Sequence, residues 1–219
     1  MVSDELLVDM VTPNSIIFLS TRYMHIFLTG KINSIQIHPM HEHILVTASS
    51  GMNGFIAVHD IRKVGNGSKP WMPLFTLDRH TKSINAAYLS PGKGEYLVSV
   101  SLDNTVKIWK DIMQNSKTPV FTSFNHDNHT GRWLSTLKPS FDPNVDHSSF
   151  SSFVLGSMAK PRRMEVYTLT TSADVSVNNP VINLSGEFLG SVCSRNCFHP
   201  SRKGVIAGGN SSGKVHLFR

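Results

Sequence analysis

The sequence is short of cysteine, of charged residues and of long hydrophobic runs. Its 219 residues include 2 cysteines, and 16% are Asp, Glu, Lys or Arg. So few cysteines argue against a disulfide-stapled secreted domain and are typical of a reducing compartment. The most apolar run, Ile16–Leu28, contains Arg22 and His25 and falls short of the about 20 apolar residues that a membrane-spanning helix needs. We therefore expect no membrane segment, and the acidic start of the chain lacks the basic region of a signal peptide.

Residue patterns that support catalysis or metal binding are also scarce. Cys193 and Cys197 lie four apart in a predicted strand, which places them on one face, and no second pair at zinc spacing accompanies them. We predict buried structural thiols. His41 and His43 flank Glu42 without a third ligand nearby, which favours an exposed loop over a metal site. The sequence places no paired carboxylates on a plausible common face, so we expect no enzyme, no metal or cofactor, and no small-molecule substrate.

Gly208–Lys214, reading GGNSSGK, nearly completes the phosphate-binding motif G-x-x-x-x-G-K-[ST]. Val215 stands in place of the magnesium-binding hydroxyl residue. Only five residues follow Lys214, too few for the helix whose N-terminus would hold the phosphate. We interpret the segment as a tight turn between two strands, and a phosphate-binding enzyme is the weakest alternative function.

One stretch, His80–Lys110, has the parts of an antiparallel unit in order. Alternating apolar residues begin at Ile84, a Ser-Pro turn begins at Ser90, and a second strand covers Tyr96–Val100. A tight turn containing an Asp then leads to a third strand that ends in Trp109. Runs with a period of two, broken by turn residues, are typical of half-buried antiparallel strands.

The unit recurs along the chain. Successive first turns are 52, 52 and 57 residues apart, measured between the prolines of His38-Pro39, Ser90-Pro91, Asp142-Pro143 and His199-Pro200. The corresponding third strands are predicted at Ile56–His59, Val106–Trp109, Met164–Tyr167 and Val215–Phe218. Four copies of one unit predict an all-β repeat protein.

The repeated unit resembles the WD-repeat family of β-propellers, although its period slightly exceeds the about 40–45 residues usual there. The resemblance implies a buried hydrogen-bonded tetrad formed by His80, Ser99, Asp103 and Trp109. The other units end in His59, Tyr167 and Phe218 in place of Trp, so we expect their tetrads to be incomplete.

The expected organisation is a WD-repeat β-propeller with about four blades present. We place the blades at about 31–79, 80–127, 128–187 and 188–219, after an atypical leader over residues 1–30 with a remnant strand at Tyr23–Leu28. WD propellers usually close with about seven blades. Four blades therefore suggest the C-terminal part of a larger propeller.

Several short sequence segments resemble those of a narrower group within the family. The group comprises WD repeat-containing protein seventy-six, its fungal relative the changed-mutation-rate protein and, more distantly, the small subunit of the damaged-DNA-binding complex. The segments are Lys31–Ile35, Arg79-His80 with Asn85–Ala87, Thr130–Leu134, Gly156–Arg163 and Gly208–Lys214. The resemblance implies a nuclear protein that binds DNA or chromatin and serves in genome maintenance. It also implies that Asp60 and Arg62 dock onto the adaptor of cullin-4 ubiquitin ligases, as the W-D-x-R box does.

The candidate DNA-binding residues come from loops that share one end of a propeller. The chain carries a net charge of +6, which mildly favours polyanionic partners. By resemblance to the small subunit of the damaged-DNA-binding complex, Lys31 corresponds to a lysine that contacts DNA. Residues 125–130 correspond to a loop that enters damaged duplex DNA. The predicted contacts are Lys31, Arg79, Lys82, His126, His129, Arg132, Lys160, Arg162 and Arg163. An interaction scaffold that binds acidic peptides is the alternative function.

Overall fold

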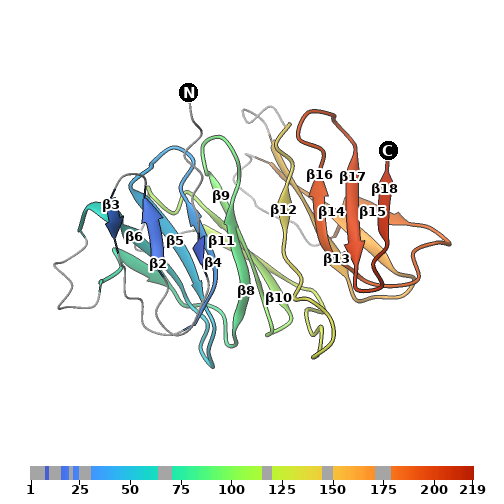
Figure 1. Cartoon of the computed structure of the whole chain (residues 1–219), viewed down its shortest axis with the longest axis horizontal. Helices are drawn as coiled ribbons and strands as arrows, with labels where there is room; N and C mark the ends of the chain where they lie inside the picture. The colour runs from blue at the N-terminus through green and yellow to red at the C-terminus, as the bar shows by residue number, and fades with distance from the viewer. Residues whose placement is uncertain are drawn as a thin grey trace.

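A computed structural model describes residues 31–63, 71–114, 120–144, 150–170 and 179–219, together with the backbone of three short strands before residue 25. From residue 31 onward its strands form four antiparallel sheets, each made of strands consecutive in sequence (Figure 1). We call these sheets blades 1 to 4. The all-β repeat architecture is confirmed, and each predicted third strand coincides with the third strand of a blade.

The first three blades each have four strands. Blade 1 contains β4 (Ile32–Ile37), β5 (Ile44–Ser49), β6 (Ile56–Asp60) and β7 (Phe75–Leu77). Blade 2 contains β8 (Ile84–Leu89), β9 (Tyr96–Ser101), β10 (Thr105–Lys110) and β11 (Val120–Asn125). Blade 3 contains β12 (Ser140–Phe141), β13 (Phe150–Ser157), β14 (Arg163–Thr170) and β15 (Ile182–Ser185).

Blade 4 has three strands within the described residues: β16 (Cys193–Phe198), β17 (Ile206–Asn210) and β18 (Val215–Phe218). A single 3-10 turn, η1 (Ile61–Lys63), follows β6. No helix in the described part of the chain is long and apolar enough to cross a membrane.

The first residues form a sheet of their own. It consists of β1 (Val8–Asp9), β2 (Ile16–Leu19) and β3 (Arg22–Met24), where the sequence predicted one remnant strand at Tyr23–Leu28. The part of that predicted strand beyond Met24 lies outside the described residues.

The hydrophobic core lies between neighbouring blades. One cluster joins blades 1 and 2 around Ile56 and Leu97, a second joins blades 2 and 3 around Ile108 and Phe153, and a third joins blades 3 and 4 around Met164. The Tyr96 hydroxyl donates to the Thr170 carbonyl at 2.7 Å and links blades 2 and 3. Because each blade buries one face against the next, the loops at the blade ends are held in fixed relative positions.

The first strands of three blades share a β-bulge one residue after they begin, at Asn33, Asn85 and Ser194. The bulge in β16 corrects the prediction for the two cysteines. In a regular strand they would share a face, but the extra residue shifts the alternation, so Cys193 is buried and Cys197 is exposed. Burial raises the pKa of the Cys193 thiol.

Candidate nucleic-acid interface

Strand direction brings two kinds of loop to one end of the blades. In each antiparallel blade, the start of the first strand and the turn between the second and third strands lie at the same end. We call this end the basic face, and the end formed by the other turns the opposite face. Hydrogen bonds tie its loops together: Ser50 N–H donates to Lys31 O at 2.7 Å, and Leu102 N–H donates to Ser83 O at 3.0 Å.

The four predicted tetrad residues of blade 2 form one continuous hydrogen-bonded chain beneath the basic face. Trp109 Nε1–H donates to Ser99 Oγ at 3.0 Å, and Ser99 Oγ lies 2.8 Å from His80 Nε2. His80 Nδ1 lies 2.8 Å from Asp103 Oδ2. Thr105, which the sequence analysis did not single out, adds its hydroxyl to Asp103 Oδ1 at 2.6 Å.

The charge state of the tetrad follows from burial and these bonds. Burial lowers the pKa of His80, against the effect of Asp103, so the ring is neutral at pH 7 and its one proton lies on Nδ1, facing the carboxylate. Burial alone would raise the pKa of Asp103, but hydrogen bonds from Thr105, His80 and Thr81 lower it to about 2. The tetrad therefore fixes the tight turn after β9 to the loop before β8.

Blade 1 keeps part of this arrangement with other residues. His59 takes the Trp109 position and Thr47 the Ser99 position, as the strand register shows. Thr47 Oγ1 lies 3.3 Å from His59 Nε2. Burial lowers the pKa of His59 to about 4, and its ring packs on Trp71 with centroids 4.4 Å apart.

Blade 3 replaces the tetrad with a network centred on Glu165, which is 4% exposed. Tyr167, at the Trp109 position, donates its hydroxyl to Glu165 Oε2 at 2.7 Å, and Arg163 Nε donates to Oε1 at 2.8 Å. His126 Nε2 lies 3.4 Å from Oε2. Burial alone would raise the pKa of Glu165, but His126 and Tyr167 lower it to about 2.

Sequence reasoning missed Glu165 because the corresponding residue of blade 2 is Lys107 rather than a member of the tetrad. Glu165 could have been found from two residues near it, which replace His80 and Trp109 of the blade 2 tetrad. His126 stands in the loop before blade 3 as His80 stands before blade 2, and Tyr167 can donate a hydrogen bond as Trp109 does. When a buried histidine and a buried tyrosine face each other across a blade, their hydrogen-bond donors need an acceptor between them.

This network corrects one predicted DNA contact and constrains two others. His126 is 7% exposed and its Nδ1 bonds Asn128 Oδ1 at 2.7 Å, so it belongs to the interior and not to the surface. Arg163 is held by Glu165, and Arg162 donates to the Met158 carbonyl oxygen. Both arginines are half-buried.

The remaining predicted contacts are exposed on the basic face. They are Lys31, Arg79, Lys82, His129, Arg132 and Lys160, and Lys214 lies on the same face. Among the described residues, the exposed acids of that face are Asp78, Asp127 and Glu187. Six exposed Lys or Arg side chains thus stand against three exposed carboxylates, which leaves the face positively charged.

Two large aromatic side chains also project from the basic face. Trp133 is 88% exposed, and the Arg132 guanidinium lies 5.4 Å from its ring centroid. Phe188 is 87% exposed in the loop before β16. Exposed aromatic rings of this size are uncommon on a surface without a partner, since each leaves a large apolar area in water.

Asp60 and Arg62, the predicted adaptor-docking pair, lie on the opposite face at the end of β6. Arg62 Nε and Nη2 donate to the two carboxylate oxygens of Asp60, each at 2.9 Å. The paired arginine holds the pKa of Asp60 at about 2. The Arg62 side chain is nevertheless 65% exposed, so its orientation is fixed while its outer edge faces water.

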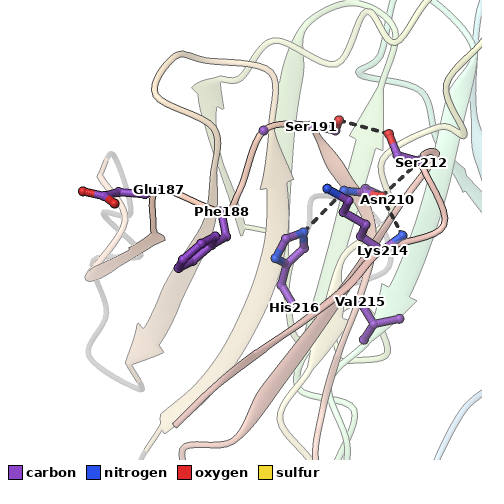
Figure 2. Close-up of a pocket in the computed structure, with 9 residues that line it drawn as sticks. Glu187, Phe188, Ser191, Asn210, Ser212, Lys214, Val215 and His216 are labelled. Atoms are coloured by element: carbon purple, nitrogen blue, oxygen red, sulfur yellow. Dashed lines mark hydrogen bonds between the residues drawn. The ribbon is translucent and has the colours of Figure 1, made fainter.

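The phosphate-loop candidate is a turn between β17 and β18, as the sequence predicted (Figure 2). Asn210 Oδ1 accepts hydrogen bonds from the backbone N–H groups of Ser212 and Lys214, each at 3.1 Å. Those two amides are therefore already satisfied within the turn. No cluster of three metal-binding side chains occurs in the described ranges, and the His41–His43 loop lies within them.

Comparison with known proteins identifies the repeat. Residues 71–110 match the profile of the WD domain, G-beta repeat. The chain is a WD-repeat protein. The matched segment begins before β7 and ends with β10, so one repeat in the sequence contributes the outer strand of blade 1 and three strands of blade 2.

Curated relatives extend this likeness over most of the chain. WD repeat-containing protein 76 from Xenopus laevis is 35% identical over 83% of this chain, and the protein of the same name from Mus musculus is 35% identical over 97%. DNA damage-binding protein cmr1 from Neurospora crassa is 28% identical over 86%. The chain spans 28%, 31% and 35% of the lengths of these three relatives.

A solved structure supports the WD-repeat propeller architecture. Sqt1 from Chaetomium thermophilum matches 85% of this chain and 42% of its own, with a TM-score of 0.57 and 22% sequence identity. At that identity the likeness concerns the fold alone. Neither the family match nor the relatives indicate an enzymatic family.

Proposed function

We propose that this WD-repeat protein is a non-enzymatic nuclear adaptor that binds DNA or chromatin through its basic face during the DNA damage response. The observation that carries the proposal is the charge of that face, where six exposed cations stand against three exposed carboxylates. The relatives support it, since one group of them is named DNA damage-binding protein. The tetrad and the Glu165 network hold the loops in place, so the cations form a fixed pattern.

Phosphate contact is the mode of binding that these side chains favour. Exposed lysines and arginines neutralise backbone phosphates and release condensed counterions, so affinity falls steeply with salt. Such contacts set the position of the protein on the duplex without reading its sequence. Half-buried Arg162 and Arg163 contribute less, because each already donates to a partner within the protein.

Fluorescence anisotropy of a labelled DNA duplex across a salt series tests the basic face. We expect the variant with Lys31, Lys82, Arg132 and Lys160 changed to Gln to bind more weakly. If all four side chains contact phosphates, the slope of log K against log salt concentration falls by about 4. All four residues are exposed, so the variant keeps the fold.

A matched control changes Lys63, Lys93, Arg202 and Lys203 to Gln. These residues are exposed on the opposite face, and their loss lowers the net charge by the same amount. Equal loss of binding in both variants would show a nonspecific effect of net charge and would contradict the assignment of the face. Folding of each protein is checked first by circular dichroism during thermal unfolding.

Exposed Trp133 and Phe188 favour a second candidate, a scaffold that binds acidic peptides, because large exposed rings also suit peptide recognition. The salt series separates the two functions. A DNA-binding face gives a salt dependence that grows with duplex length and no preference for acidic peptides. A peptide scaffold gives tight binding of an acidic peptide and weak binding of DNA at physiological salt.

The finer part of the proposal concerns Asp60 and Arg62, which would dock onto the adaptor of cullin-4 ubiquitin ligases. The support is geometric, since Asp60 orients an arginine that is 65% exposed on the face away from the proposed DNA contacts. A substrate receptor needs two separate surfaces, and this arrangement supplies them.

Binding of the purified adaptor to the immobilised chain tests this docking role. We expect Arg62→Ala to lower the affinity at least 10-fold, because a guanidinium held in one orientation loses little entropy on binding. Lys63→Ala, which removes a neighbouring exposed charge, serves as the control. Unchanged binding of Arg62→Ala would remove these two residues from the proposal and leave DNA binding untouched.

A further inference from the structure

The first strands of blades 1 and 2 lie side by side beneath the basic face. Asn33 Nδ2 in β4 donates to the Ile84 carbonyl oxygen of β8 at 2.7 Å, and Gln36 Oε1 accepts from the Leu89 N–H at 2.6 Å. A side chain near the start of one first strand therefore reaches the first strand of the next blade. One position in this region, five residues before the proline of each first turn, differs strongly between blades. Its occupants are Ser34, Ala86, Lys138 and Arg195.

Blades 1 and 2 fill this position with small neutral residues that are buried. Ser34 is 5% exposed and its hydroxyl accepts from the Ala87 N–H at 2.9 Å, while Ala86 is 0% exposed. Blades 3 and 4 place Lys138 and Arg195 there, and Lys138 is half-buried. Taking a cation out of water is costly unless an anion accompanies it. Lys138 therefore needs a negative partner more than a surface lysine does.

Lys138 and Arg195 lie close to each other at the junction of blades 3 and 4. Arg195 Nη1 donates to the Thr136 carbonyl oxygen at 2.5 Å, two residues before Lys138. Leu137 is fully buried in the core of blades 2 and 3, so the backbone that carries Lys138 is held in place. Burial lowers the pKa of Lys138, and the positive charge of Arg195 lowers it further. The two positive charges thus repel each other.

Within the described ranges, no carboxylate forms an ion pair with either of these cations. The ion pairs found there join other basic residues to Asp60, Glu95, Asp103 and Glu165. The neighbour of Arg195 in blade 2 is instead the half-buried Tyr88, where burial raises the pKa of the phenol and Arg195 lowers it. A phenol can donate a hydrogen bond, as an ammonium and a guanidinium do. Three blades therefore bring donors and positive charge to one place.

The guanidinium of Arg195 keeps a suitable edge for a phosphate. Its hydrogen bonds to the Thr136 and Ser194 carbonyl oxygens both come from Nη1. Nε and Nη2 share another edge of the planar group, and their parallel N–H bonds match two oxygens of a phosphate. The contact with Thr136 also orients that edge, since it holds the guanidinium at one end.

We propose that Lys138 and Arg195 form a phosphate-binding site just inside the basic face, with the Tyr88 hydroxyl as a third donor. Arg195 holds two phosphate oxygens through Nε and Nη2, and Lys138 contributes a second positive charge. The phosphate is either free in solution or part of the backbone of a DNA strand that lies over the basic face. Only the second source rests on the proposed function.

Thermal unfolding of the whole chain in sodium phosphate tests the site, with sodium chloride of equal ionic strength as the reference. At a phosphate concentration ten times the dissociation constant, we expect the Tm of the wild type to rise by about 3–6 °C. The variant with Lys138 and Arg195 changed to Gln should lose most of this rise. Arg195→Lys keeps the charge but removes the bidentate edge, so it should weaken phosphate binding on the order of 5-fold.

A control variant changes Lys93 and Arg202 to Gln. Both residues are exposed on the opposite face, so this variant loses the same charge without touching the site. We expect its Tm to rise in phosphate as that of the wild type does. Because phosphate also stabilises folded proteins in general, the rise that the double variant at Lys138 and Arg195 retains measures that general effect.

DNA binding by the same proteins identifies the source of the phosphate. If the site holds a DNA phosphate, the double variant at Lys138 and Arg195 should lower the slope of log K against log salt concentration by about 2. An unchanged slope together with a lost phosphate response assigns the site to a free phosphate. A wild type that bound no DNA would refute the proposed function, and the phosphate titration would still decide the site.

Two results would overturn the proposal. If phosphate raised the Tm of the double variant as much as that of the wild type, the anion would act elsewhere on the protein. If the double variant did not fold, Arg195→Lys would decide, because Arg195 is exposed and its replacement keeps the charge. A dissociation constant for phosphate equal to that of the wild type would then contradict the site.

Discussion

Replacing Glu165 by alanine should lower the free energy of unfolding by about 3–5 kcal/mol, the usual cost of removing one partner from a buried charged pair. The carboxylate is 4% exposed and accepts from Tyr167 and Arg163. Without it, the Tyr167 hydroxyl is left buried with no acceptor. The loss corresponds to a fall in Tm on the order of 10 °C for a chain of this size.

Exposed Glu187 supplies the matched control, since Glu187→Ala removes the same charge from the surface of the basic face and leaves the buried network intact. We expect it to change stability by less than about 0.5 kcal/mol. Urea unfolding followed by circular dichroism measures both variants. Equal midpoints for wild type and Glu165→Ala would show that the buried network of blade 3 contributes nothing to stability.

The same carboxylate predicts a pH dependence with a defined sign. Its pKa is lowered from 4.5 to about 2 in the folded protein. A depressed pKa contributes stability above the unfolded value, and that contribution is lost as pH falls through the folded value. The stability difference between wild type and Glu165→Gln should therefore shrink as pH falls from 4.5 towards 2.

Sequence spacing was sufficient to predict the blade 2 tetrad but not its counterpart in blade 3. The strand period fixes which residues of β9 and β10 face each other, so a histidine, serine, aspartate and tryptophan at family spacing already imply their contacts. Glu165 does not follow from that pattern, because one carboxylate takes the hydrogen bonds that Ser99 and Asp103 share in blade 2. Such a substitution becomes visible only when the side chains are placed together.

Loop residues were harder to predict than strand residues for a related reason. His126 and His129 lie three apart in one loop, yet the first is buried and the second exposed. No strand period extends through that loop, so the sequence gives no rule for which imidazole turns inward. The Cys193–Cys197 error arose from a bulge, which reverses the alternation on which the prediction depended. Local backbone irregularities therefore limit what the sequence alone can assign to the candidate site.

Trp109 is the other residue whose loss should have a large effect. It is 1% exposed, packs in the core between blades 1 and 2, and donates a hydrogen bond to Ser99. Trp109→Ala opens a cavity at this interface and should cost about 3–5 kcal/mol. Trp109→Phe keeps most of the apolar contact and loses the hydrogen bond, so it should cost less, and the chain itself places Phe218 at this position in blade 4.

The control for Trp109→Ala is Trp133→Ala, which removes the same side chain from a site that is 88% exposed. We expect urea unfolding to show a stability change within about 0.5 kcal/mol for this variant. In a DNA-binding assay we expect the opposite order, with the larger effect from Trp133→Ala. Trp133 projects from the proposed contact face beside Arg132, so its loss should weaken binding without altering the fold. A large stability loss from Trp133→Ala would mean that this ring packs inside the protein, and would remove it from the contact face.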